Sequence, residues 1–269
     1  TQCTQYAAAL LGSEQVPYYC RSMELQQNNL IAIIGDSHAH AVFPGIADIA
    51  KQHGYGTILL ANSSCPPLKG FKWGINSKEE MLCQEKIGQI LTVLKKDNRI
   101  KRVLMLTRGP VYIHGEVEGI FSSETVKQSL VKTKFEKQTY ATYFDGYRAT
   151  LNILESIPHI SKVLYMLENP ELDFLPKDVV PRPYDVLGVS VNRNSVDKRY
   201  YLQRMAEYRK YLGMLSFPKL TILDPINTLC DEDTCYSNID GKFLYADDDH
   251  FSVLGSHHIA SYFQELIFE

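Results

Sequence analysis

The segment from Leu30 to Ala41 reads LIAIIGDSHAHA. Its first five residues are apolar and mostly β-branched, which is typical of a strand that is buried on both faces of a parallel sheet. Gly35 ends this run, and from His38 onward the apolar residues recur with helical spacing. The segment therefore predicts a buried strand, a sharp turn and a helix over residues 38–53.

Ser37 lies on this turn, where two interpretations compete. Serine is favoured as the N-cap of a helix, where its hydroxyl accepts a hydrogen bond from the first turn. A serine in this position is also suited to nucleophilic attack, because its backbone N–H lies beside a helix N-terminus and can stabilise a developing anion. The local sequence leaves both interpretations open.

A second informative segment lies near the C-terminus, where residues 245–255 read YADDDHFSVLG. Serine becomes a good nucleophile when a base takes its proton, and histidine titrates in the range required. Asp247 precedes His250 by three residues, and a carboxylate at that spacing can reach the second imidazole nitrogen. Asp248 and Asp249 compete for this role. The alternative is an acidic, solvated loop whose histidine caps the last helix.

Composition excludes several classes of protein. The chain has 269 residues, 45% hydrophobic and 22% charged, which suits one large soluble α/β domain or such a domain with an appendage. With a net charge of -3 and no Lys/Arg-rich run, we expect no nucleic-acid partner. No run approaches the roughly 18 to 20 apolar residues of a transmembrane helix, and no signal peptide is evident. Because the chain begins at Thr1, we expect it to be a processed or excised part of a longer protein.

The six cysteines fall into three neighbouring couples. None has the C-x-x-C spacing of a zinc site, so we predict no metal site. Proximity in the sequence favours the pairs Cys3–Cys20, Cys65–Cys83 and Cys230–Cys235 among the possible connectivities. Such disulfides imply an oxidising compartment such as the bacterial periplasm.

Strands and helices alternate along the rest of the chain, which favours a mostly parallel five-stranded sheet covered by helices on both faces. Further strands are expected at residues 57–61, 103–107, 162–167 and 220–223. Further helices are expected at residues 78–94, 140–157, 195–215 and 253–268. Residues 111–135 suggest an insertion or small hairpin, residues 172–191 a long surface loop, and residues 230–245 a small loop or hairpin. We divide the chain into an N-terminal extension, residues 1–29, packed on a main domain, residues 30–269.

Three motifs together carry a resemblance to a known family: GDSH at residues 35–38, SCPPL at residues 64–68 and DDDHFS at residues 247–252. They resemble the SGNH, or GDSL-like, hydrolase superfamily. The closer likeness is to the SGNH domains fused to acyltransferase-3 membrane domains in bacterial surface-glycan O-acetyltransferases. This resemblance implies a three-layer α/β/α sandwich of flavodoxin-like type. It also implies a catalytic triad in which Ser37 is the nucleophile, His250 the base and Asp247 the residue that orients His250.

The expected oxyanion hole departs from the superfamily pattern. The superfamily usually adds a glycine N–H after the second strand and an asparagine side chain after the third. Here the candidates are the Ser37 N–H, a backbone N–H near Ser64 and the Arg108 guanidinium, since several types of donor stabilise an oxyanion. Arg108 is alternatively a structural ion-pair partner. His38 and Asn62 are candidates for substrate binding, and Asn62 is alternatively a turn residue.

The resemblance implies transfer of an acetyl group, through an acyl-serine, to a sugar hydroxyl of a periplasmic glycan such as the O-antigen of lipopolysaccharide. The acetyl donor would be supplied by a membrane acyltransferase domain of the same protein, which would tether this domain to the inner membrane. No cofactor is expected. A carbohydrate or lipid acyl esterase with water as acceptor uses the same triad, so the motifs do not choose between the two. A catalytically silent glycan-binding domain is a third possibility.

Overall fold

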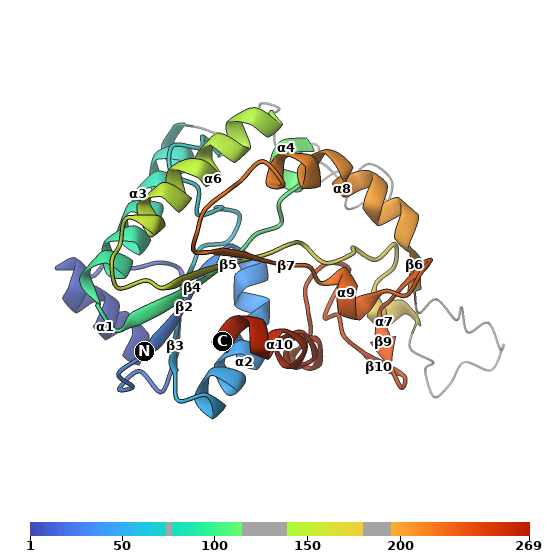
Figure 1. Cartoon of the computed structure of the whole chain (residues 1–269), viewed down its shortest axis with the longest axis horizontal. Helices are drawn as coiled ribbons and strands as arrows, with labels where there is room; N and C mark the ends of the chain where they lie inside the picture. Colours follow the sequence, from blue (N-terminus) through green and yellow to red (C-terminus); the bar gives the residue numbers. More distant parts are fainter. Residues whose placement is uncertain (74–76, 115–138, 180–194) are drawn as a thin grey trace.

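The computed structural model describes residues 1–73, 77–114, 139–179 and 195–269. A six-stranded sheet forms its centre, in the order β1-β3-β2-β4-β5-β7 (Figure 1). Its strands are β1 (Tyr19–Met23), β2 (Leu30–Gly35), β3 (Gly56–Ala61), β4 (Ile100–Leu106), β5 (Lys162–Met166) and β7 (Leu220–Leu223). All neighbouring pairs are parallel except β1 and β3, which are antiparallel. The sheet is therefore mostly parallel, as the alternating pattern predicts.

The order of the parallel strands determines where a ligand would bind. The chain runs from β2 outward to β3, then returns to the other side of β2 to form β4, β5 and β7. This is the flavodoxin-like order, in which the connections leave in opposite directions from the carboxyl ends of β2 and β4. Ligands of open α/β sheets bind at such a switch point. Ser37 and Arg108 each lie two residues beyond these two strand ends.

Helices cover both faces of the sheet and complete the three layers (Figure 1). One face packs against α1 (Gln2–Leu11), α3 (Ser77–Lys96), α6 (Tyr140–Glu155) and α8 (Lys198–Leu212). The other packs against α2 (Ser37–Gln52) and α10 (Val253–Phe268). Alternate residues of β2 enter the two cores, because successive side chains of a strand point to opposite faces. This explains why the whole of β2 is apolar.

The remaining elements are short and lie outside the central sheet. They are α4 (Val111–His114), α7 (Pro176–Val179), β6 (Ser195–Asp197), α9 (Ile226–Leu229), β8 (Thr234–Tyr236), β9 (Asn238–Ile239) and β10 (Lys242–Phe243). β9 and β10 form a hairpin, and β6 pairs with β8. The insertion or hairpin suggested for residues 111–135 lies outside the described residues beyond residue 114, and the loop predicted at 172–191 lies outside them from residue 180.

The structure extends the sequence-based prediction at the N-terminus. Residues 19–23 of the N-terminal extension form β1, so the sheet has six strands where the pattern indicates five. β1 reads YCRSM, a run without a continuous apolar stretch, and it forms by pairing with β3. The predicted helix over residues 195–215 is shorter in the structure, because its first three residues form β6 and pair with β8.

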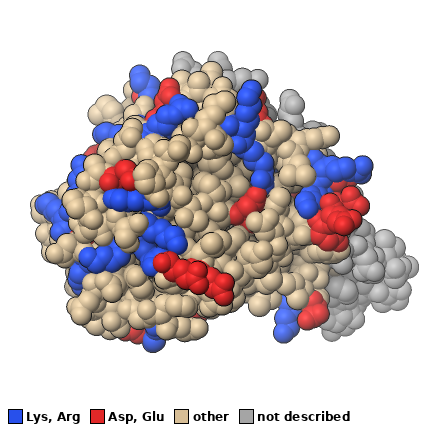
Figure 2. Space-filling view, viewed as in Figure 1, with Lys and Arg blue, Asp and Glu red and all other residues tan. Residues whose placement is uncertain are grey.

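All six cysteines form disulfides, and the pairs are the three that proximity predicted: Cys3–Cys20, Cys65–Cys83 and Cys230–Cys235. Among the described residues, no helix combines the length and the apolar character that crossing a bilayer requires. On the face drawn in Figure 2, Lys and Arg side chains are interspersed with acidic ones.

Buried tyrosines form part of the core beneath the end of β4. The Thr107 hydroxyl lies 3.0 Å from the Tyr143 hydroxyl and 3.1 Å from the Tyr147 hydroxyl. Tyr208 and Tyr165 join the same cluster through their own hydroxyls. Because each buried hydroxyl has a partner, this core contains polar groups without leaving them unsatisfied.

Candidate active site

The turn between β2 and α2 requires a glycine at its start. A Cβ atom on Gly35 would lie 1.9 Å from the carbonyl oxygen of Leu106, so β2 and β4 approach too closely for any side chain there. Ser37 follows as the first residue of α2. The backbone N–H of a residue in the first turn has no partner within its own helix. The Ser37 N–H is therefore suited to bind an oxyanion, and this role remains a prediction.

Asp36, between these two residues, connects the switch-point ends of β2 and β4. Its Oδ1 accepts a hydrogen bond from the His38 N–H at 2.9 Å and so caps α2. Its Oδ2 accepts from the Arg108 N–H at 2.9 Å and from the Tyr112 hydroxyl at 2.6 Å. Burial, reinforced by the Asp36 carboxylate, raises the pKa of Tyr112 well above its usual value. Tyr112 therefore stays a hydrogen-bond donor, and three hydrogen bonds to the Asp36 side chain hold the turn that carries Ser37.

His250 contacts Ser37 directly, although 213 positions separate them in the sequence. Its Nε2 lies 2.8 Å from the Ser37 Oγ. Its Nδ1 lies 3.0 Å from Asp247 Oδ2 and 2.7 Å from Asp249 Oδ1. Since Nδ1 faces carboxylates, we assign the proton of the neutral imidazole to that nitrogen, and in this neutral form Nε2 can accept the Ser37 hydroxyl proton.

Two aspartates thus compete for the second nitrogen of His250, as the DDDH sequence suggests. Asp247 makes the contact with hydrogen-bond geometry, and its Oδ1 also accepts the His250 backbone N–H at 2.7 Å. The Asp249 oxygen is closer and far more buried, with 4% of its side chain exposed against 44% for Asp247. The three-residue spacing identifies Asp247 but gives no information about this second carboxylate.

The two carboxylates dominate the protonation of His250. Burial disfavours the charged imidazolium, but the contacts with Asp247 and Asp249 outweigh it and raise the pKa of His250 to about 10. The pKa of Asp249 shifts in the opposite direction. Burial alone would raise this pKa, but the neighbouring His250, His38 and Arg108 hold it well below its usual value.

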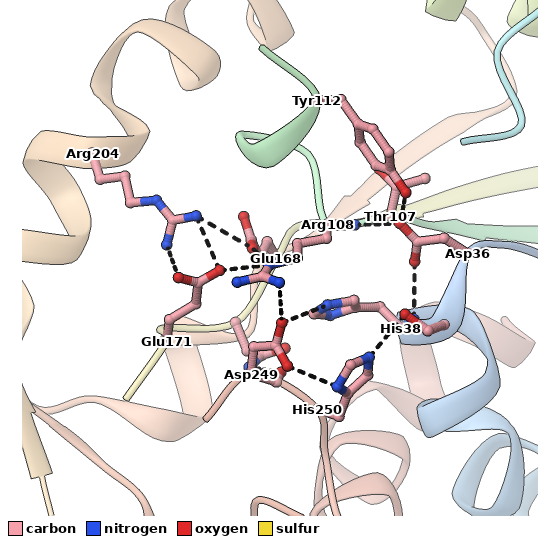
Figure 3. A network of polar contacts seen from close by, with 12 residues as sticks. Asp36, His38, Thr107, Arg108, Tyr112, Glu168, Glu171, Arg204, Asp249 and His250 are labelled. Carbon is pink, nitrogen blue, oxygen red and sulfur yellow. Dashed lines mark hydrogen bonds and ion pairs between the residues drawn. The ribbon is translucent and has the colours of Figure 1, made fainter. Parts of the chain in front are cut away.

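Asp249 also joins His250 to a buried ionic network (Figure 3). Its Oδ2 lies 2.8 Å from Arg108 Nη1 and 3.5 Å from His38 Nε2. Arg108 Nε in turn donates to Glu171 Oε1 at 2.9 Å. The Arg108 guanidinium, a predicted oxyanion donor, therefore bridges two carboxylates. These contacts support the ion-pair alternative, in which Arg108 positions Asp249.

Arg204 of α8 completes the network from the far side. Its Nη1 lies 2.5 Å from Glu171 Oε2, and its Nη2 lies 3.7 Å from Glu168 Oε1. Burial, reinforced by Glu171 and opposed by Arg204, raises the pKa of Glu168 well above its usual value. Burial also acts on Glu171, but Arg204 and Arg108 outweigh it and lower the pKa of Glu171. The two arginines therefore make their shortest ionic contacts with Glu171 and Asp249, and both lie farther from Glu168, at 3.8 Å for Arg108 and 3.7 Å for Arg204.

The loop after β5 holds the loop that carries His250. The side-chain amide of Asn169 donates to the Asp249 carbonyl at 2.9 Å, and the Leu172 N–H donates to the Asp248 carbonyl at 2.7 Å. Residues 168–172 read ENPEL and follow a predicted strand, so their position at the carboxyl edge of the sheet was available from the sequence. The contact of Arg204 with this network is not predictable from the sequence, because Arg204 is one of many charged residues in its helix.

The two predicted substrate-binding residues, His38 and Asn62, lie in different surroundings. The His38 side chain is 2% exposed, and its ring centroid lies 4.6 Å from that of His250, so it packs behind the base. Asn62 is buried in the loop after β3, where its Oδ1 accepts the Tyr18 N–H at 2.8 Å. Ser64 lies exposed in the same loop with a positive φ of 51°. The substrate and oxyanion roles of these residues remain predictions.

One group of side chains has the composition of a metal site. The imidazoles of His38 and His250 and the carboxylate of Asp249 offer ligand atoms within 4.8 Å of one another. However, Nε2 of His250 contacts Ser37, and Asp249 already faces the cationic Arg108 guanidinium. These side chains therefore already have partners within the protein.

Comparison with known proteins shows which family this chain belongs to. The model of the family described as SGNH domain (fused to AT3 domains) matches residues 3–265. The chain belongs to this family. The matched residues include β1. A comparison with curated protein sequences finds no match.

Two solved structures resemble this SGNH domain. The periplasmic domain of a lipopolysaccharide acetyltransferase from Salmonella ser. Paratyphi A has a TM-score of 0.54 and 17% identity, covering 100% of this chain and 98% of that chain. A family two carbohydrate esterase from Clostridium thermocellum, solved with cellohexaose, has a TM-score of 0.46 and 11% identity, covering 90% of this chain and 64% of that one. At these identities, the first similarity supports the fold of the SGNH domain.

Proposed function

We propose that this chain is the acyl-transferring domain of an AT3-fused protein, and that it passes an acetyl group through Ser37 to a sugar hydroxyl of a bacterial surface glycan. The observation that carries the proposal is the 2.8 Å contact between Ser37 Oγ and His250 Nε2 at the switch point of the sheet. The family supplies the context, because its members are fused to AT3 domains. The membrane domain would then present the acetyl donor.

Each residue has a defined part in the proposed reaction. His250 Nε2 takes the Ser37 proton as Oγ attacks the acetyl carbonyl, and the resulting oxyanion lies near the Ser37 N–H. His250 then protonates the departing group, which leaves acetyl-serine. A sugar hydroxyl gives its proton to His250 and attacks this ester. The bond between the acyl carbon and Ser37 Oγ then breaks, His250 returns the proton to Oγ, and the acetylated sugar leaves. Asp247 and Asp249 stabilise the imidazolium that forms twice in the cycle.

The localisation belongs to the same proposal. Three disulfides indicate folding in an oxidising compartment. The Salmonella domain, whose fold resembles this one, is the periplasmic domain of a lipopolysaccharide acetyltransferase. We propose that this domain likewise acts in the periplasm on a glycan of O-antigen type.

The test has two readouts on purified protein. An activated ester, p-nitrophenyl acetate, is supplied with a bacterial oligosaccharide, and mass spectrometry detects acetyl transfer to the sugar. Ser37→Ala should lower turnover at least about 10³-fold, because the nucleophile is lost. Ser13→Ala, an exposed serine near the N-terminus, is the matched control and should retain full activity.

The outcomes separate the alternatives. Release of free acetate without an acetylated sugar would identify a plain esterase. Covalent labelling of Ser37 by a fluorophosphonate would argue against a catalytically silent domain. Full activity in Ser37→Ala would overturn the proposal.

A further inference from the structure

A pocket of about 360 Å³ opens beside the loop that follows β3, outside the network around His250. Its lining includes Asn62, whose backbone N–H donates to the Gly35 carbonyl at 3.1 Å. Gly35 lies two residues before Ser37, so the pocket is next to the turn that carries the nucleophile. Its volume falls within the range of about 300 to 1,000 Å³ that is usual for small-molecule sites.

Three separate segments form the walls of this pocket. Tyr18 comes from the N-terminal segment, residues 62–65 and Trp73 come from the loop after β3, and Glu79, Leu82, Cys83 and Lys86 come from α3. The Cys65–Cys83 disulfide joins the second of these segments to the third, and both cysteines line the pocket. A covalent bond within the wall gives the pocket a shape that does not depend on a ligand.

The N-terminal segment is held against the other two walls by hydrogen bonds. The Lys86 ammonium donates to the Val16 carbonyl at 3.2 Å, and the Tyr18 N–H donates to Asn62 Oδ1 at 2.8 Å. Tyr18 itself is 77% exposed. The N-terminal segment therefore supplies an exposed aromatic ring to the pocket.

The lining has the chemistry that a neutral sugar needs. The exposed ring of Tyr18 and the half-exposed Leu82 offer apolar surface, on which the C–H face of a pyranose can pack. Ser63 and Ser64 add exposed hydroxyls for the polar edge of a sugar. Asn62 lies beneath these residues, only 7% exposed, and contributes to the same lining.

The charges of the lining argue against an anionic ligand. Lys86 contributes the positive charge and Glu79 the negative one, so the two types of charge balance. A phosphate or carboxylate ligand would require an excess of cationic groups. The lining therefore favours an uncharged, hydroxyl-rich ligand.

We propose that this pocket binds a neutral pyranose unit of the acceptor glycan. As an acceptor site, it rests on the proposed function, whereas its binding of the sugar can be tested without any reaction. The N-terminal segment then has a functional part, because it supplies Tyr18 to the acceptor site.

Trp73 provides the measurement, because it is the only tryptophan of the chain and lines this pocket. Ser37→Ala protein, which cannot form the acyl-enzyme, is titrated with the methyl glycosides of glucose, galactose, mannose and rhamnose and with short oligosaccharides of them. At least one probe should cause a saturable change in tryptophan emission. Adding Tyr18→Ala should raise the dissociation constant about tenfold, while Tyr18→Phe should retain the ring and the affinity.

Tyr262→Ala is the matched control, because Tyr262 is 51% exposed on α10, the helix on the opposite face of the sheet. It should leave the dissociation constant unchanged. The proposal is overturned when no probe gives a saturable change, or when Tyr18→Ala and Tyr262→Ala weaken binding equally.

The same experiment distinguishes failure of this inference from failure of the proposed function. Acetyl transfer by the unmodified domain without Tyr18-dependent sugar binding would overturn the pocket alone. Tyr18-dependent sugar binding without acetyl transfer or ester hydrolysis would overturn the transferase and leave a sugar-binding pocket.

Discussion

Gly45 of α2 and Ser256 of α10 lie in direct contact: the Gly45 N–H donates to the buried Ser256 Oγ at 2.8 Å. The same hydroxyl donates to the Val42 carbonyl at 2.8 Å. α2 begins at Ser37, and α10 begins three residues after His250. This contact therefore holds together the two helices whose N-terminal ends lie at Ser37 and next to His250, the proposed nucleophile and base.

Gly45→Ala should disturb both stability and activity. A Cβ atom at this position would lie 2.2 Å from the Ser256 carbonyl oxygen, so one helix must move. Overpacking of this kind costs about 1 to 3 kcal/mol of unfolding free energy. We expect a loss in that range in urea denaturation and a slower hydrolysis of p-nitrophenyl acetate, since Ser37 and His250 shift apart.

Gly88→Ala is the control for this substitution. Gly88 lies in the interior of α3, and a Cβ atom there meets nothing within 4 Å. Alanine is favoured over glycine in a helix by up to about 1 kcal/mol, so this variant should be slightly more stable and fully active. Equal effects of the two substitutions would show that the contact between α2 and α10 has no special role.

Asp249→Asn should move the pH dependence of hydrolysis. The pKa of His250 is raised to about 10, so its neutral form, which acts as the base, increases as the pH rises through the alkaline range. Asn removes a negative charge 2.7 Å from Nδ1, which lowers this pKa. The rising limb of kcat/KM should therefore move to lower pH by about one to three units. The maximal rate should fall, because His250 loses a buried partner.

Asp247→Asn is the comparison variant. Its hydrolysis rates are measured under the same conditions, and the residual rate of Ser37→Ala protein is subtracted from the rates of both variants. The Asp247 side chain is 44% exposed, and water screens its charge more than that of Asp249. We expect a shift in the same direction but of smaller size. A larger shift for Asp247→Asn would mean that the exposed Asp247 carboxylate, rather than the buried Asp249 carboxylate, controls the pKa of His250.

The sequence predicted the parts of the fold that local patterns determine. The run of apolar residues at 30–34 forms β2, and Ser37 of the GDSH turn contacts His250, which follows Asp247 by three residues, as the two motifs predict. β1 was missed because its strand forms by long-range pairing with β3 and has no apolar run. β6 was hidden for the same reason, at the start of a helical pattern.

The parts of the site that remained hidden depend on contacts between distant segments. Three consecutive aspartates precede His250, and spacing alone does not show that Asp249 faces inward toward Arg108. Arg204 comes from a helix whose many charges look alike in the sequence, and only its packing against Glu171 distinguishes it. Burial and tertiary pairing, rather than residue type, select these side chains.

Loss of the Cys65–Cys83 disulfide should lower stability. The double variant Cys65→Ala/Cys83→Ala opens a loop with a sequence separation of 18, which by chain entropy costs about 3 kcal/mol. Thermal unfolding should show a reduced Tm, and Ellman titration of the denatured variant should find no free thiol, since the other two disulfides persist. A Tm equal to that of the unmodified chain would mean that the loop is held without this bond.

Arg204→Met should destabilise the domain through the carboxylate that it leaves behind. Glu171 has 1% of its side chain exposed, and without Arg204 it retains Arg108 as its only cationic partner among the described residues. Removing one member of a buried ion pair typically costs about 3 to 5 kcal/mol. Adding Glu171→Gln should recover part of this loss, because the buried charge is then removed as well. Urea denaturation of both single variants and the double variant measures the coupling, and strictly additive effects would show that the two residues do not interact.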